Sequence, residues 1–256
     1  MLMLMALVGS PGTVTAVTNP RPGSVITIDA PGAVGTLDPV QATTPAERFR
    51  VAALFDRLVG LASDERRYPA AAVAWRVSPD SLTWRFTMRP GMTFTNGQPV
   101  SADAVARSWS RPTSGAATGR RIRGLSAVAD ENELVVTLVR PHPRLLAALS
   151  DPVYGIVCLV EGKDGPSLAG SGSFRLARPP QGGEIFLAPR LDDQRGRPMP
   201  AGIVVRSRPD APAGSRITWP DNLRGMIIDD VAGTVDLSMA WSQAPRAAAT
   251  AKPGQR

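Results

Sequence analysis

Alternation of apolar and polar residues marks the strands that this chain is expected to form. In TWRFTM, the side chains of Trp84, Phe86 and Met88 share one face, which predicts a strand with one buried side. A similar run precedes it across a Pro-Asp-Ser turn, so residues 71–90 are expected to form two short strands. The same reasoning predicts strands at 24–30, 202–210 and 234–241 and hairpins at 125–141 and 172–190.

Helical spacing of apolar residues, together with capping signals, predicts the helices. Thr44 and Glu47 enclose Pro45 in a complete capping box, after which apolar residues recur at helical spacing. Ser101 follows an Asn-Gly turn and a proline, and it is placed to cap a helix that carries Asp103 in its first turn. The expected helices cover 45–61, 101–111, 144–150 and 223–231.

The size and composition of the chain fit a globular protein. At 256 residues and 43% hydrophobic content, it can bury a sizeable core in one or two domains. The charged fraction of 20% argues against disorder and against a membrane protein. No internal repeat is visible.

The formal charge of +7 does not predict a nucleic-acid partner. Lys163 and Lys252 are the only lysines among 29 basic residues, and the abundance of arginine, alanine, glycine and proline is typical of a GC-rich coding bias. The arginines are scattered, with the densest run at 120–123, whereas nucleic-acid readers usually show a basic stripe with interleaved aromatics.

The two ends of the chain are expected to lie outside the folded core. Residues 1–16 combine a short apolar run with Val14 and Ala16 at cleavage positions, which predicts an export signal, although a positive n-region is missing. The apolar run is too short to span a bilayer, and no cysteine follows it that could carry a lipid anchor. Residues 244–256 are expected to be a mobile tail.

The sequence offers little for catalysis, and we predict no catalytic residue, no metal site and no cofactor. His142 is the only histidine and is expected in a solvated loop, while Cys158 is the only cysteine and is expected to be a buried apolar residue. Nucleophile-elbow, Walker and dinucleotide motifs are absent, and the GSGSF segment precedes a strand rather than a helix. Asp192-Asp193 and Asp229-Asp230 are expected at solvent. A hydrolase that uses only carboxylates stays open as an alternative.

The ordered set of segments resembles the family 5 extracellular solute-binding proteins. The most specific piece is PAAAVAWRVSPDSLTWRFTMRPGMTFTNGQPVSADAVARSW, and TLDPVQ, ALFDRLVGL, AVADENELVVTLVRPHPRLLAAL and GSGSFRLARPPQGGEIFLAPR lie around it in the family's order. The resemblance covers about residues 24–241. Two departures are a GSGSF in place of the family's usual GTGPY, and PRLDDQRGRP where a bulky N-x-x-Y-W segment normally stands.

The resemblance implies an α/β fold with mixed sheets, namely the first lobe of a periplasmic-binding-protein-like type II clamshell. Family members are roughly twice as long, so the second lobe is expected to be absent. The expected division is a core subdomain from 17–65 and 166–243, with an inserted subdomain from 66–165.

The resemblance also implies a function, namely capture of a peptide, nickel complex or related small solute by a monomeric bacterial periplasmic protein that serves the permease subunits of an ABC importer. No enzyme activity, no nucleic acid and no membrane insertion after signal removal are expected. Two alternatives are a truncated remnant or interaction module without solute capture, and a secreted hydrolase.

Position within the family pattern also gives candidate ligand-binding residues. They are Gly32, Ala33, Gln41, Thr43, Thr44, Asp151, Tyr154 and Ser171. Each has a structural explanation beside the functional one: Thr44 is a helix cap, and Ser171 can shape a turn. The side chains of Trp75, Trp84 and Trp109 could stack on a solute, but their predicted positions are in the core or at its rim.

Overall fold

The computed structural model describes residues 25–31, 35–61, 67–113, 115–162, 165–193, 201–208, 228–229 and 234–235. The expected signal at 1–16 and the expected tail at 244–256 lie outside these residues. Among the described residues, no helix is both long and apolar enough to cross a bilayer.

The first sheet combines the N-terminal strand with strands from the C-terminal half of the chain. It has the order β1-β12-β11-β10, in which β1 and β12 are parallel and the other neighbours are antiparallel. Helix α1, Pro45–Leu54, packs Phe49, Val51 and Ala53 into the same apolar cluster as Ile185 and Val205 of this sheet. The strands are β1 Val25–Pro31, β10 Phe174–Leu176, β11 Glu184–Pro189 and β12 Gly202–Arg208.

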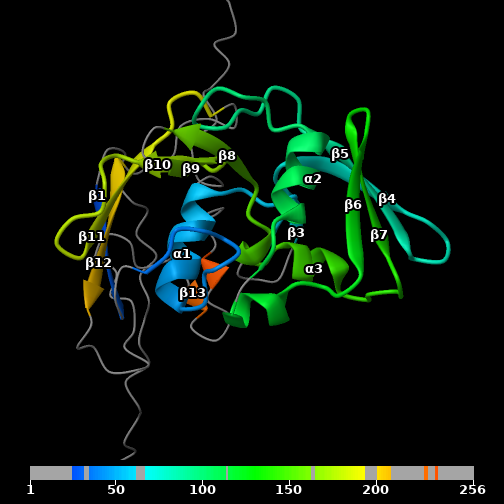
Figure 1. Ribbon diagram of the computed structural model, residues 1–256, viewed down its shortest axis with the longest axis horizontal. Coiled ribbons are helices and arrows are strands. Elements are labelled where there is room, and N and C mark those ends of the chain that lie inside the picture. Colours follow the sequence, from blue (N-terminus) through cyan, green and yellow to red (C-terminus); the bar gives the residue numbers. More distant parts are fainter. Residues whose placement is uncertain are drawn as a thin grey trace, which may run out of the picture.

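The second sheet is built from consecutive antiparallel strands in the order β4-β5-β7-β6. Its inner face and the helices α2, Ala102–Ser110, and α3, Leu145–Leu149, share an apolar cluster around Phe86, Leu134 and Val105. Figure 1 shows α1 between the two sheets in this view. The strands are β4 Ala72–Val77, β5 Thr83–Met88, β6 Leu125–Asp130 and β7 Glu133–Leu138.

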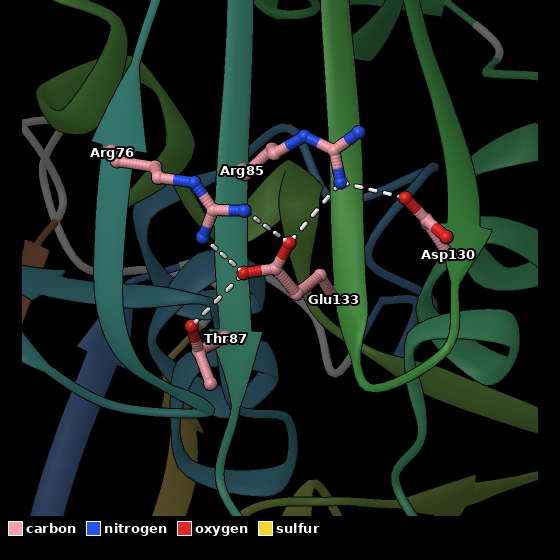
Figure 2. A network of polar contacts seen from close by, with 5 residues as sticks. All are labelled: Arg76, Arg85, Thr87, Asp130 and Glu133. Carbon is pink, nitrogen blue, oxygen red and sulfur yellow. Dashed lines mark hydrogen bonds and ion pairs between the residues drawn. The ribbon is translucent and has the colours of Figure 1, made fainter.

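The outer face of the second sheet carries a charge-paired network that crosses all four strands (Figure 2). Glu133 accepts hydrogen bonds from both terminal nitrogens of Arg76, one of them at 2.7 Å, and from Nη1 of Arg85 at 3.1 Å. Arg85 Nη1 also donates to Asp130 Oδ2 at 2.6 Å, and Thr87 donates to Glu133. Two arginines are therefore neutralised by two carboxylates.

Smaller elements accompany the two sheets. These are β2 Val59–Leu61 with β3 Arg67–Pro69, β8 Val157–Gly162 with β9 Gly165–Gly170, β13 Ile228–Asp229 with β14 Thr234–Val235, and the 3-10 helices η1 Gly115–Arg120 and η2 Pro152–Tyr154.

Most of the predicted elements are confirmed. The strand pair within 71–90 and both hairpins are present. Strands also cover most of 24–30 and of 202–210, and helices follow Ser101 and Pro143. The GSGSF segment is followed by a strand, as predicted.

Two predicted helices are wrong in part. The helix from Pro45 ends at Leu54 instead of residue 61, because Phe55 is extended, with φ −130° and ψ 126°, and Val59–Leu61 pairs with Arg67–Pro69. In the helix predicted at 223–231, Ile228–Asp229 forms a strand that pairs with Thr234–Val235 instead. The rest of that helix, and the predicted strand beyond Val235, lie outside the described residues.

Candidate ligand-binding site

The carboxyl ends of the parallel strands β1 and β12 lie at the same edge of the first sheet. Pro31 is the register partner of Arg208 at this edge. Ligands of open α/β sheets bind at the carboxyl ends of the strands, so the loop after β1 is the natural place for one. Gly32 and Ala33, two of the sequence-predicted site residues, lie in this loop but outside the described residues.

The chain from Gly35 to Thr44, called the cap loop below, is held by the carboxylate of Glu47. Its Oε1 accepts the backbone N–H of Thr36 at 3.0 Å, and its Oε2 accepts those of Thr43 and Thr44, both at 2.9 Å. The side chain of Thr44 in turn caps helix α1 by accepting from the N–H of Glu47 at 3.2 Å. One side chain thus fixes both ends of the cap loop.

The same hydrogen bonds decide the ionisation of Glu47. Burial opposes the charged form most strongly, but the backbone donors of Thr44, Thr43 and Thr36 together outweigh it and lower the pKa from 4.5 to about 2. Gly35 is required next to this carboxylate, because it has φ +57° and a Cβ there would lie 2.1 Å from Glu47 Oε1.

The sequence-predicted residues of the cap loop remain accessible. Gln41 and Thr44 are exposed and Thr43 is half-buried. The side-chain oxygen of Gln41 accepts a hydrogen bond from Thr36 Oγ1 at 3.3 Å, and the Thr43 hydroxyl donates to Glu47. The structure therefore gathers these three residues on one rigid loop at the amino end of α1.

A cavity of about 540 Å³ lies between the cap loop and the other end of helix α1. Its apolar walls come from residues such as Leu37, Phe55 and Phe174, and its polar groups include Thr95 and Arg175. None of the sequence-predicted site residues that the structure describes lines this cavity. No sequence pattern pointed to it, because its walls come from five separate segments of the chain.

The GSGSF segment closes the floor beside this cavity. A Cβ at Gly170 would lie 2.5 Å from Leu54 O, and one at Gly172 would lie 2.6 Å from Leu54 C, so the two backbones touch. Between them, the buried Ser171 hydroxyl accepts from Asp56 N at 2.9 Å and donates to Ile156 O at 2.7 Å. Ser171 thereby ties the end of α1 to the entry of β8.

Asp151 and Tyr154 lie at η2, whose C-cap Gly155 approaches the cap loop: a Cβ there would lie 2.9 Å from Pro39 Cγ. Asp151 accepts the N–H of Val153 at 2.9 Å and pairs with Arg48 of α1 at 3.0 Å, and burial raises its pKa. Tyr154 is buried, its hydroxyl accepts from Ile122 N at 2.8 Å, and burial raises its pKa. Both residues are engaged inside the protein.

The tryptophans pack in the interior or at its rim, as predicted. Trp109 is buried and donates through Nε1 to the Tyr154 carbonyl at 3.1 Å. Trp75 and Trp84 are partly buried against Phe86, with ring centroids 6.5 and 6.3 Å from it.

The histidine and the cysteine differ somewhat from expectation. His142 is half-buried rather than fully solvated, and Cys158 is half-buried, with its sulfur 3.1 Å from Gln98 Oε1. Within the described ranges, no group of three potential metal-ligating side chains comes together.

Comparison with known proteins shows which family this chain is similar to. The model of the bacterial extracellular solute-binding proteins, family 5 (middle), matches residues 66–215. The dipeptide-binding protein DppE of Bacillus subtilis is 31% identical over an alignment of 150 residues, and the match covers 48% of this chain and 28% of that protein. The nickel-binding periplasmic protein of Escherichia coli is 36% identical over 66 residues, 26% of this chain and 13% of its own.

A solved structure gives the same answer for the fold. The ABC transporter-associated periplasmic binding protein DppA from Helicobacter pylori, in complex with the peptide STSA, superposes with a TM-score of 0.59 at 23% identity, and the match covers 74% of this chain and 43% of that one. The chain belongs to the family 5 extracellular solute-binding proteins. It spans less than half the length of these relatives and has the mixed α/β fold of one lobe.

Proposed function

We propose that this chain provides the ligand-contacting lobe of an extracytoplasmic bacterial solute-binding protein, which captures a peptide or a related small solute for an ABC importer. The observation that carries the proposal is the Glu47-anchored cap loop at the carboxyl edge of the parallel strand pair. Family membership supports it, since the relatives in that family are named as dipeptide- and nickel-binding proteins.

The mechanism follows from the backbone that the lobe presents. The N–H groups of Thr36, Thr43 and Thr44 are already bound to Glu47, so an extended peptide would pair its own N–H groups with main-chain carbonyls after β1, in the manner of strand addition. The Glu47 hydrogen bonds hold the cap loop before the ligand arrives, so little ordering entropy is lost on binding. In a clamshell, a second lobe then buries the opposite side of the ligand, and the closed form docks on the permease subunits.

The location and organisation belong to the same proposal. We propose export of a monomer through the signal at 1–16, and a lobe in which 66–165 is inserted between 17–65 and 166–243. Most members of the two apolar clusters, one around Phe86 and Leu134 and the other around Phe49 and Val205, fall on opposite sides of this division, which supports it. Leu58, Val59 and Ala169 in the first cluster and Val157 in the second cross the division and join the two parts.

Thermal unfolding with a panel of short peptides tests the proposal. A ligand that binds the native state raises the melting temperature in a saturable way, and we expect this for a subset of di- to tetrapeptides. The panel includes a nickel chelate, because of the nickel-binding relative. The E47Q variant should lose most of the response, whereas E161Q, at an exposed position of β8, should keep it.

The outcomes separate the alternatives. A folded chain with no response to any solute would favour a remnant or an interaction module without capture. The peptide is also recovered and analysed by chromatography. Intact peptide agrees with a binding protein, whereas cleavage by the chain would favour a hydrolase and overturn the proposal.

A further inference from the structure

A second cavity, of about 230 Å³, lies at one end of the β6–β7 hairpin. Among the described residues, the charged side chains that line it are all basic, namely Arg120, Arg121, Arg123 and Arg140, and the imidazole of His142 lies beside them. In the sequence these arginines look scattered, because the 120–123 run and the 140–142 segment are separated by the whole hairpin.

The register of the hairpin explains why they meet. Leu125 at the start of β6 pairs with Leu138 at the end of β7, so the residues before one strand and after the other leave the sheet at the same end. Gly124 has φ +71°, and a Cβ there would lie 2.6 Å from Val139 Cγ2, which shows how closely the two segments approach. Arg123 and Arg140 flank this contact and both are exposed.

The basic run is fixed from behind by buried residues. Arg121 donates through Nη1 to the carbonyls of Trp109 and Arg111, and its guanidinium lies over the Tyr154 ring, 5.7 Å from the centroid. The next residue, Ile122, donates its N–H to the Tyr154 hydroxyl at 2.8 Å. The guanidinium of Arg121 is therefore held in place by contacts with the interior.

Within the part of the chain that the structure describes, no carboxylate lines the cavity. Asp151 lies 3.6 Å from Arg120, but it is already paired with Arg48 at 3.0 Å. Among the described residues, no carboxylate forms an ion pair with Arg123 or Arg140.

The outer face of the same sheet provides an internal comparison. There, Arg76 and Arg85 are register partners on neighbouring strands, and Glu133 and Asp130 neutralise both (Figure 2). Like charges on adjacent strands are destabilising unless they are compensated. By the same rule, an anion would stabilise the clustered arginines of the cavity.

Buried nitrogens without hydrogen-bond partners also favour an anion in this cavity. Nε and Nη2 of Arg121 and Nδ1 of His142 are buried without a hydrogen-bond partner among the described residues, and both side chains line the cavity. A nearby anion would stabilise a buried guanidinium that carries unsatisfied N–H groups.

We propose that this cavity is a binding site for a phosphate group, separate from the solute site. Guanidinium groups bind phosphate oxygens through paired hydrogen bonds, and arginine is favoured over lysine for this purpose. Arg123 and Arg140 would contact the group directly, and Arg121 would add fixed positive charge behind it. The phosphate can come from a soluble anion or from the headgroup of an anionic phospholipid.

The first experiment follows the melting temperature during titration with inorganic phosphate, at an ionic strength held constant with chloride. The wild type should show a saturable rise, and R123Q/R140Q should bind phosphate about tenfold more weakly or worse. The matched control is R107Q/R206Q, which removes the same charge from exposed arginines that have their own carboxylates. If R123Q/R140Q does not fold, R140Q alone replaces it.

The second experiment separates the two sources of phosphate. Retention on phosphatidylglycerol vesicles but not on phosphatidylcholine vesicles, lost in R123Q/R140Q and kept in the control, would assign the site to a lipid headgroup. Phosphate binding without vesicle retention would assign it to a soluble phosphate. An equal phosphate response from both double variants, with no selective vesicle retention, would overturn the proposal.

Discussion

Gly170 and Gly172 are fixed by contact with backbone rather than by their conformational freedom. Neither has a positive φ, but each lies against Leu54 at the end of α1. The GSGSF segment departs from the family's usual GTGPY at its other three positions but keeps both glycines, and in the structure both glycines are needed for this contact.

Replacing Gly172 by alanine tests this explanation. A new Cβ would lie 2.6 Å from Leu54 C and 2.7 Å from Ala53 O, and backbone atoms cannot move aside as a flexible side chain can. We expect G172A to lose about 1–3 kcal/mol of unfolding free energy in urea. The control is G119A, where no atom lies within 4 Å of the added Cβ. Equal stability of the two variants would contradict the account.

The ionisation of Glu47 gives a second prediction at the residue scale. Its folded pKa of about 2 is below the ordinary 4.5, so ionised Glu47 contributes stability that is complete above pH 4.5 and is lost as the pH falls towards 2. Above this window, E47Q should be less stable than the wild type by up to about 3 kcal/mol.

Urea unfolding of both proteins across this range measures the effect. The difference between the wild type and E47Q should shrink as the pH decreases through the window, while E161Q should follow the wild type. A difference between the wild type and E47Q that does not depend on pH would show that the carboxylate charge does not hold the cap loop.

At the scale of elements, local signals predicted what local interactions control. The capping box at Thr44 and the cap at Ser101 are present as expected, because their hydrogen bonds close within one turn. The end of α1 was not predictable in the same way: apolar spacing continues past Leu54, but Gly172 N donates to Leu54 O at 2.9 Å and Ile156 N donates to Asp56 O at 2.8 Å. These partners are distant in sequence.

The candidate site shows the same limit. Thr44 and Glu47 were visible as a helix start, but nothing in the sequence indicated that Glu47 also binds Thr36 N. The parallel pairing of β1 with β12 and the pairing of β8 with β9 depend on contacts that no local pattern encodes.

The network on the outer face of the second sheet predicts a modest, salt-dependent effect. E133Q removes the carboxylate that Arg76 and Arg85 share, so the urea midpoint should fall at low salt and recover relative to the wild type at high salt. A double-mutant cycle with R76Q should give a coupling energy that salt reduces. Additive effects at low salt would mean that the network contributes nothing.

At the scale of the whole molecule, the two apolar clusters are expected to respond separately to damage. L134A removes a fully buried side chain from the cluster of the second sheet and should cost about 2–4 kcal/mol. Amide exchange should accelerate in β4–β7 and much less in β1 and β12. Equal acceleration in both sheets would indicate one cooperative unit instead.

The central claim is that the cap loop after β1 contacts a solute. A titration of ¹⁵N-labelled chain with short peptides, followed by amide chemical shifts, tests it most directly, since peptide at about 5 mM reveals even binding as weak as about −4 kcal/mol. The account predicts saturable shifts that concentrate in the cap loop, residues 35–44, and that are lost in E47Q. Shifts confined to other surfaces, or no shifts with any peptide, would contradict it.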